Sequence, residues 1–198
     1  MAVVLTLAAD NVTATQRALL LAHPDAAGDA VWSVGVDVEL IPGSSLLCRY
    51  CLRGDLARVR VPGTGAGAGQ RADRLWEHTC CEAFIGAAGE AGYYEFNFSP
   101  ALDWAAYRFE DYRTGMTAAT LSQAPELHVR HTPRELELSA TVPLAGLTAL
   151  RRTPALRVAL AVVIEEQNGG HAYWALQHAP GHPDFHHPDS FALELRCR

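Results

Sequence analysis

An aromatic ring, a carboxylate and an amide alternate along residues 93–98 (YYEFNF), a segment well suited to ligand chemistry. In an extended strand Tyr93, Glu95 and Asn97 share one face, while the even-numbered aromatic residues share the other. We interpret the second face as core. The first face suits a sugar or another polar cyclic ligand, because rings stack on apolar sugar faces while carboxylates and amides bond to hydroxyl groups. The spacing is also typical of an ordinary polar strand face.

Glu82 lies on a second predicted strand, 76–85, and forms with Glu95 a pair of acids on neighbouring strands. Two carboxylates that flank a glycosidic bond are the catalytic arrangement of glycosidases. Such pairs also occur by chance, and the sequence holds neither a G-x-S-x-G nor an H-E-x-x-H motif. Binding without catalysis is therefore the preferred interpretation, with hydrolysis as an alternative.

Histidines gather near the end of the chain, where three of them are spaced by four residues. Pro180, Gly181 and Pro183 rule out a regular helix in this segment, so we expect a loop. A loop can still gather His178, His182, Asp184 and His186 around one divalent metal, as in a metal-dependent enzyme. The other interpretation is a structured loop whose polar groups cap strand ends near the mouth of the fold.

The cysteines offer a C-x-x-C spacing at Cys48 and Cys51, which resembles a redox or zinc motif. Both lie on a predicted strand, where residues three apart point to opposite faces and do not pair readily. The same objection applies to the adjacent Cys80 and Cys81. We expect Cys48 and Cys80 in the core, and Cys51 and Cys81 as incidental thiols.

The elements that position these residues are mostly strands, because apolar residues recur with a period of two. The expected strands are 1–7, 32–40, 46–53, 58–61, 76–85, 93–99, 136–142, 156–164, 173–177 and 191–195.

Other local signals refine this pattern. Residues 42–44 predict the turn of a hairpin, and residues 62–69 an exposed loop. The segment 156–164 is apolar on both faces and is expected to be a central strand, and 143–152 a short helical turn. With very little helix, the pattern predicts one all-β domain over 1–198, an antiparallel β-sandwich.

Composition excludes several classes of function. The net charge is −6 and no arginine run forms a basic face, so no nucleic-acid partner is expected. All 16 basic residues are arginine, which excludes a Schiff-base lysine and a phosphate-loop lysine. No apolar run approaches the ~20 residues of a membrane span, so no membrane association is expected. Five cysteines, an odd number, and no secretion signal favour a cytoplasmic protein with reduced thiols.

Three blocks carry a family resemblance: WEHTCCEAFIG at 76–86, YYEFNFSPALDWAAYRFEDYRTGM at 93–116 and YWALQHAPGHPDFHHPDSFALEL at 173–195. They resemble the bacterial DOMON-like domain proteins, which are related to the family-nine carbohydrate-binding modules. The resemblance implies a galactose-binding-like jelly-roll sandwich and a ligand that is a sugar or haem. Cys81 departs from it, because an aromatic residue is expected at that position.

The resemblance and the strand pattern together place a ligand-binding region around 76–113. The candidate ligand-binding residues are Trp76, Glu77, Glu82, Tyr93, Tyr94, Glu95, Asn97, Trp104, Arg113 and Trp174.

Three functions follow as hypotheses. The first is a non-catalytic module that binds a carbohydrate or similar small molecule, and it requires at least one of Tyr93, Trp76 and Trp104 to lie outside the core. The second is a haem-binding electron-transfer domain, in which Met116 pairs with His78 or His178. The third is a metal-dependent enzyme that uses the histidine loop.

Overall fold

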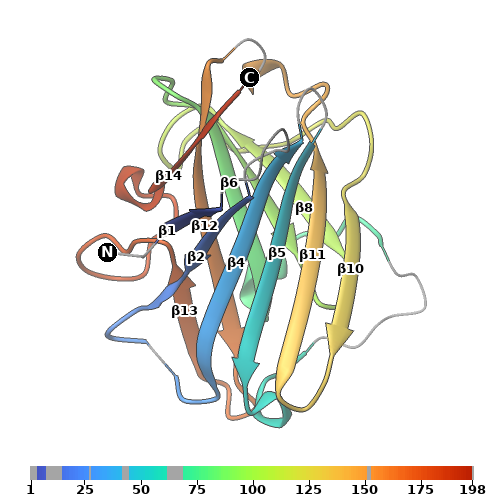
Figure 1. The fold of residues 1–198 in the computed structure, drawn as a ribbon, viewed down its shortest axis with the longest axis vertical. Helices are drawn as coiled ribbons and strands as arrows, with labels where there is room; N and C mark the ends of the chain where they lie inside the picture. The colour runs from blue at the N-terminus through green and yellow to red at the C-terminus, as the bar shows by residue number, and fades with distance from the viewer. Residues whose placement is uncertain are drawn as a thin grey trace.

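The chain folds into two antiparallel sheets that pack face to face (Figure 1), in a computed structural model that describes residues 4–7, 15–26, 28–41, 45–61, 69–150 and 153–197. Within these residues the helices are four 3₁₀ turns of three residues each. The predicted all-β sandwich with very little helix is therefore confirmed. No helix in the described ranges is long and apolar enough to cross a membrane.

The first sheet has six strands, in the order β1-β2-β4-β5-β11-β10. Its strands are β1 (Val4–Leu7), β2 (Thr15–Leu19), β4 (Val31–Ile41), β5 (Ser45–Gly54), β11 (Glu135–Pro143) and β10 (Glu126–His131).

The second sheet has eight strands, in the order β3-β13-β12-β6-β7-β8-β9, with β14 also paired to β12. Its strands are β3 (Leu21–Ala22), β13 (His171–Ala175), β12 (Ala155–Glu165), β6 (Cys80–Ala87), β7 (Tyr93–Phe98), β8 (Trp104–Phe109), β9 (Thr117–Ala118) and β14 (Leu193–Arg196).

The hairpin expected from the first two strong strand signals is present, because β4 and β5 pair antiparallel over their length. Trp32 was expected on the buried face of β4, but its side chain is 58% exposed. The pairing register shifts between Val31 and Ser33, and this irregularity buries Val31 in place of Trp32. The turn residues 42–44 lie outside the described ranges.

The core between the sheets is built from the alternate residues of both, as period-two burial requires. Phe96 and Phe98 of β7 are fully buried in it and stack at 6.3 Å. Tyr50 crosses the core from β5, and its hydroxyl donates to the backbone oxygen of Glu82 on β6 (2.8 Å). The two sheets are thus joined by a hydrogen bond directly below Glu82.

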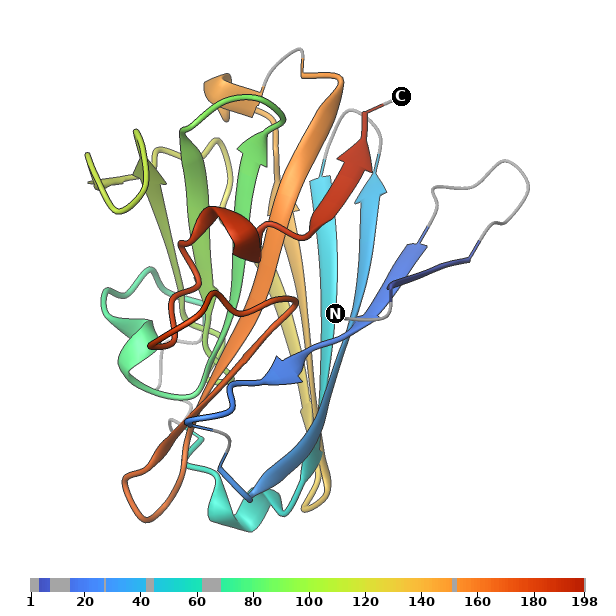
Figure 2. The same cartoon turned by 90° about the vertical axis from the view of Figure 1, so that its left-hand side faces the viewer.

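The eight-stranded sheet is buried on its outer face as well. Every residue of β6 and β7 is buried, and a second apolar cluster contains Phe84, Tyr93 and Phe185. Figure 2 shows the sheets from the side, with residues 70–79 and 176–192 lying against this outer face. The central position predicted for β12 is confirmed, since it pairs with β13 and β6 on its two sides.

Several local expectations were wrong. Residues 56–58 form the 3₁₀ turn η1 (Leu56–Arg58) where a strand over 58–61 was expected, and β6 begins at Cys80 rather than at 76. Residues 75–77 instead form the 3₁₀ turn η2 (Leu75–Glu77). The strand β8 was missed because residues 104–107 (WAAY) are apolar or aromatic in succession and show no period-two alternation. Of the loop expected at 62–69, all but Gly69 lies outside the described residues.

The inter-sheet core predicts a large stability cost for truncation of Phe96. Replacement of this fully buried ring by alanine is expected to lower the free energy of unfolding by about 3–5 kcal/mol, because a cavity remains. Urea denaturation measures the change. Leu19→Ala, at a side chain that is 55% exposed, is the control and is expected to change stability by less than ~0.5 kcal/mol. Equal effects of the two variants would contradict this packing.

Candidate functional site

A pocket of about 370 Å³ opens on the outer face of the eight-stranded sheet, beneath the two covering segments. Its floor comes from β6, β7 and β12, and its walls come from η2, β13 and the loops 110–116 and 176–192. The lining residues are Trp76, Glu82, Glu95, Phe109, Arg113, Met116, Val163, Tyr173, Pro183, Phe185 and His186.

The floor is polar at its centre and flanked by small side chains. Glu82 of β6 lies directly opposite Asn97 of β7. On the same cross-strand row, Ala161 of β12 neighbours Glu82 and Ala105 of β8 neighbours Asn97. Methyl side chains on both sides leave the polar pair recessed between bulkier neighbours, which is the shape that a ligand pocket requires.

Asn97 holds the Glu95 carboxylate from the same strand. Its Nδ2 donates to Oε1 of Glu95 (2.7 Å), while its Oδ1 accepts from Sγ of Cys80 (3.7 Å). Burial raises the pKa of Glu95 to about 7, although the Asn97 hydrogen bond and the Arg113 charge both lower it. Glu95 therefore titrates near neutral pH.

Glu82 is the more deeply buried acid, with 3% of its surface exposed. Its Oε1 has no hydrogen-bond partner in the structure. Burial, and then the nearby Glu95 charge, raise the pKa of Glu82 well above its usual range, although the Arg113 charge lowers it. An unpaired buried oxygen of this kind costs about 1–3 kcal/mol, a cost that a ligand donor would remove.

His186 lies above Glu95 and is held by Tyr93. The Tyr93 hydroxyl accepts from the backbone N–H of Arg113 (3.3 Å) and forms a hydrogen bond with Nδ1 of His186 (2.8 Å). Nε2 of His186 lies 3.7 Å from Oε2 of Glu95, too far for a hydrogen bond. Burial and then the Arg113 charge lower the pKa of His186 to about 4, so the ring is neutral.

Arg113 and Asp184 join the two loops on one side of the pocket. Nε and Nη2 of Arg113 donate to Oδ1 of Asp184 (3.2 and 2.8 Å), and the Tyr112 hydroxyl donates to the other oxygen. Arg113 has a φ of 50°, a conformation that costs a residue with a side chain about 1–2 kcal/mol. Its bonds to Asp184 and Tyr93 hold the loop in this conformation.

Aromatic rings form the other walls. Trp76 of η2 is partly exposed and packs edge-to-face on Tyr107 at 5.6 Å. Tyr173 of β13 lies 6.0 Å from Phe185 of the covering loop. The pocket thus sets rings around an acidic and amide floor.

Of the predicted ligand-binding residues, Trp76, Glu82, Glu95 and Arg113 line the pocket. Asn97 and Tyr93 support it from behind through the bonds to Glu95 and His186. Since Trp76 is only partly buried, the condition set for the binding hypothesis is met.

Three predicted contact residues are corrected, since Tyr94, Trp104 and Trp174 lie in the core between the sheets. In each case it is the adjacent residue of the strand that points to the outer face of the sheet, where the pocket lies, because neighbouring residues of a strand point to opposite faces. Glu77 is also outside the lining: it is exposed and pairs with Arg74 at the surface.

Sequence reasoning missed several lining residues, among them Tyr173, Phe185, Phe109 and Val163. The phase of β7 would have indicated Phe109, because it lies opposite Tyr93 on the neighbouring strand. No local signal marks Phe185, since only the path of the loop brings it over the sheet.

The four residues expected to hold a metal are not brought together. No three of His178, His182, Asp184 and His186 place ligand atoms within 4.8 Å of one another. Nε2 of His178 contacts the backbone oxygen of Leu21, and His182 is exposed. His186 lines the pocket, and Asp184 accepts from Arg113. The alternative of a structured loop describes this segment better.

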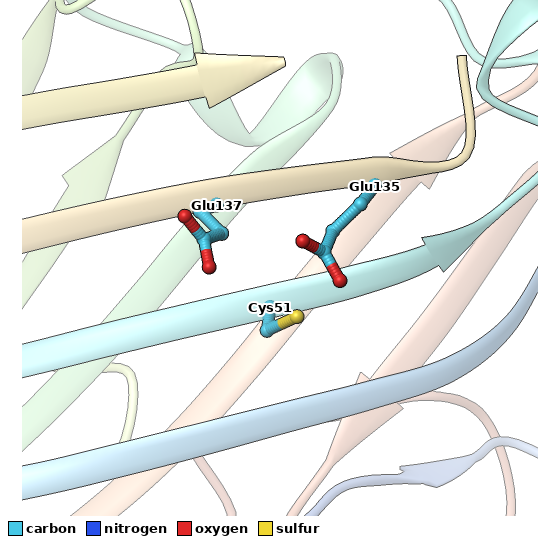
Figure 3. A group of neighbouring side chains, drawn as sticks. All are labelled: Cys51, Glu135 and Glu137. Carbon is cyan, nitrogen blue, oxygen red and sulfur yellow. The ribbon is translucent and has the colours of Figure 1, made fainter. Parts of the chain in front are cut away.

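Within the described residues, one group of three does place its ligand atoms within 4.8 Å of one another: Cys51 of β5 with Glu135 and Glu137 of β11 (Figure 3). Arg53 donates to Glu135 (2.8 Å) and Arg130 pairs with Glu137 (3.2 Å). Both carboxylates therefore already have cationic partners from the chain.

The cysteines of the C-x-x-C spacing behave as expected, with Cys48 in the core and Cys51 half-buried on the opposite face. Cys80 and Cys81 differ from expectation. Both are buried, but it is Cys81 that enters the core between the sheets, while Cys80 lies beside Asn97 on the pocket side.

The residues named for a haem site do not contact one another in a common site. Met116 lines the pocket, whereas Nδ1 of His78 is held by Glu165 (2.7 Å) and His178 by Leu21. His186, not His78 or His178, is the histidine that shares the pocket with Met116.

Comparisons with known proteins show a shared fold at low identity. No family model matches the chain, and no curated protein is similar to it. A protein from Bacteroides uniformis, whose assignment as carbohydrate-binding is provisional, is similar over 80% of this chain and 75% of its own, with a TM-score of 0.59 and 17% identity. This likeness supports the β-sandwich fold.

Family-nine carbohydrate-binding modules from Caldicellulosiruptor kristjanssonii are also similar. The complex with cellotriose has a TM-score of 0.46 and 10% identity, over 75% of this chain and 67% of its own. The complex with glucose has a TM-score of 0.43 and 11% identity, over 75% and 69%. These TM-scores are too low to carry an argument about this chain.

The Glu95–Asn97 bond predicts a measurable titration. Glu95 is expected to titrate near pH 7, and Asn97→Ala to raise its pKa further, because the carboxylate loses its donor. Carbon-detected NMR of the glutamate carboxyl groups measures both values. Asn168→Ala, which removes a similar amide from Glu166, is the matched control and should leave Glu95 unchanged. Titration of Glu95 near pH 4.5 would contradict this site.

The same raised pKa predicts a dependence of stability on pH. The contribution of Glu95 to the free energy of unfolding is complete below pH ~4.5. It is lost as pH rises through about 7, because Glu95 ionises at a lower pH in the unfolded chain than in the folded protein. Glu95→Gln removes this loss, so the variant should gain on the order of 3 kcal/mol relative to wild type between pH 4.5 and 8. Urea denaturation across this range tests it. A difference in stability between Glu95→Gln and wild type that stays constant with pH would contradict the raised pKa. Such a constant difference is the result expected for the exposed control variant Glu194→Gln.

Proposed function

We propose that the protein is a non-catalytic module that binds a saccharide in the pocket around Glu82 and Glu95. The observation that carries the proposal is the combination of partly exposed rings, Trp76 and Tyr173, over a recessed floor of carboxyl groups. Rings stack on the apolar face of a pyranose, and carboxyl groups accept and donate hydrogen bonds to its hydroxyls.

The volume and position of the pocket support the proposal. About 370 Å³ lies within the range of small-molecule sites, and a pyranose unit is a ligand of this class. The unpaired Oε1 of Glu82 supplies a polar atom at the bottom, and Nε2 of His186 supplies a second one, 3.7 Å from the Glu95 carboxyl group. A sugar ring with hydroxyls on its rim would use both.

The proposal extends to the family and the setting of the protein. The sequence blocks that resemble DOMON-like proteins contribute Trp76, Glu95 and His186 to one pocket, which supports that finer assignment. All five cysteines are free, which supports a reducing compartment such as the cytoplasm.

Binding is tested by isothermal titration against glucose, galactose, mannose, xylose and cellotriose. Trp76→Ala and Tyr173→Ala are each expected to weaken any saccharide that binds by about tenfold or more, because aromatic contacts dominate such sites. Trp32→Ala is the matched control, since this exposed ring lies on the other sheet.

Two outcomes would contradict the proposal. One is an affinity for these saccharides that the pocket variants leave unchanged. The other is cleavage of cellotriose by the wild-type protein, seen by chromatography and abolished in Glu82→Gln, since this would make the pair of acids catalytic.

A further inference from the structure

The pocket floor concentrates acidic groups without supplying a cation. Glu82 and Glu95 both line it, and within the described residues no arginine donates a hydrogen bond to either carboxyl group. Arg113 is the one basic guanidinium in the lining, and its Nε and Nη2 are already bonded to Asp184. The Arg113 charge still lowers the pKa of both glutamates, but Arg113 donates a hydrogen bond to neither, so Oε1 of Glu82 remains open to a ligand donor.

The unpaired oxygen of Glu82 points to a ligand that donates. This side chain is 3% exposed, lines the pocket and leaves Oε1 without a partner. Glu95 beside it has one donor, the amide of Asn97. A primary ammonium group carries three donors and a positive charge, and so matches two neighbouring carboxyl groups better than a neutral hydroxyl does.

The walls favour a cation as well. Trp76, Phe109, Tyr173 and Phe185 line the same pocket. The face of an aromatic ring attracts a cation, by about 0.5–2 kcal/mol according to exposure. Aromatic walls over an acidic floor are a general arrangement for ammonium recognition.

We propose that the group bound over Glu82 and Glu95 is a protonated amine, and that the ligand class is an amino sugar with a free amino group. This inference rests on the proposed saccharide function, and specifies which saccharides the pocket prefers. The sugar ring lies between Trp76 and Tyr173, and the ammonium points to the floor. An N-acetylated sugar lacks the charge and two of the donors, so it binds less well.

Binding of an ammonium is coupled to protons. The titratable and charged groups facing the floor are Glu82 and Cys80 from β6, Glu95 and Tyr93 from β7, Tyr107 from β8 with its partner Asp73, Arg113 from loop 110–116, and Asp184 and His186 from loop 176–192. The pocket-lining residues of β12, β13 and η2 add no formal charge. A bound cation favours the ionised carboxylates, so binding releases up to about one proton, and affinity rises from pH 5.5 to about pH 6.5, a range in which a sugar amine keeps its own proton.

The test is isothermal titration of wild-type protein with glucosamine, glucose, N-acetylglucosamine and ethanolamine at pH 6, where the amines are fully protonated and Glu95 is not yet ionised. Glucosamine is expected to bind at least ~tenfold more tightly than glucose or N-acetylglucosamine. Repeating the titration in two buffers of different ionisation enthalpy is expected to show net proton release for glucosamine alone among the sugars.

Variants locate the effect. Glu82→Gln and Glu95→Gln are expected to remove the preference for glucosamine, and Glu194→Gln, at an exposed position on β14, to keep it. Glutamine resembles the protonated acid, and circular dichroism confirms that each variant is folded. The pH dependence of the wild type needs no variant and tests the same point.

The outcomes separate the two proposals. Equal affinity for glucose and glucosamine, without proton release, overturns the amine inference and leaves the saccharide function standing. Binding of ethanolamine with no binding of any sugar overturns the saccharide function and supports an amine site. Failure of all four compounds to bind overturns the amine inference.

Discussion

Burial of both faces of β6 and β7 is the constraint on which the rest of the structure depends. One face packs on the six-stranded sheet, and Tyr50 bonds across the core to the backbone of Glu82. The other face needs a cover, which residues 70–79 and 176–192 provide (Figure 2). The pocket lies where this cover leaves a polar part of the sheet open. Both the fold and the position of the pocket therefore follow from the need to shield the two apolar faces of this sheet from water.

The polar groups under the cover oppose stability. A buried carboxyl group with an unpaired oxygen and a second acid beside it would be replaced by apolar residues if packing alone mattered. Asn97 instead holds Glu95 by a hydrogen bond, and Tyr93 holds His186 above it. Such concentrations of perturbed titratable groups in a pocket are typical of functional sites. This cost is the main physical reason to place function here.

The six-stranded sheet shows the contrasting case. Its outer face carries ion pairs such as Arg17 with Asp37 and Arg53 with Glu135, which are exposed and each contribute about 0–1 kcal/mol. With one face in contact with water, β5 and β11 alternate between buried and at least partly exposed positions, and so does β4 from Ser33 to Glu39. Period-two patterning therefore predicted β4, β5 and β11 nearly to the residue, apart from the irregularity at Trp32. The strands of the covered sheet, such as β8, lack that contrast.

The sequence by itself determined the all-β sandwich and the sharing of one strand face by Tyr93, Glu95 and Asn97, because alternation is a local property of extended chains. It also excluded lysine chemistry outright. Only the tertiary structure decided which aromatic residues face the pocket, since Trp104 and Trp174 differ from their neighbours by one residue of phase. It alone showed that His186 lines the pocket and that Asp184 bonds to Arg113, so the two do not form a metal site. Loop paths depend on long-range packing, which no local spacing encodes.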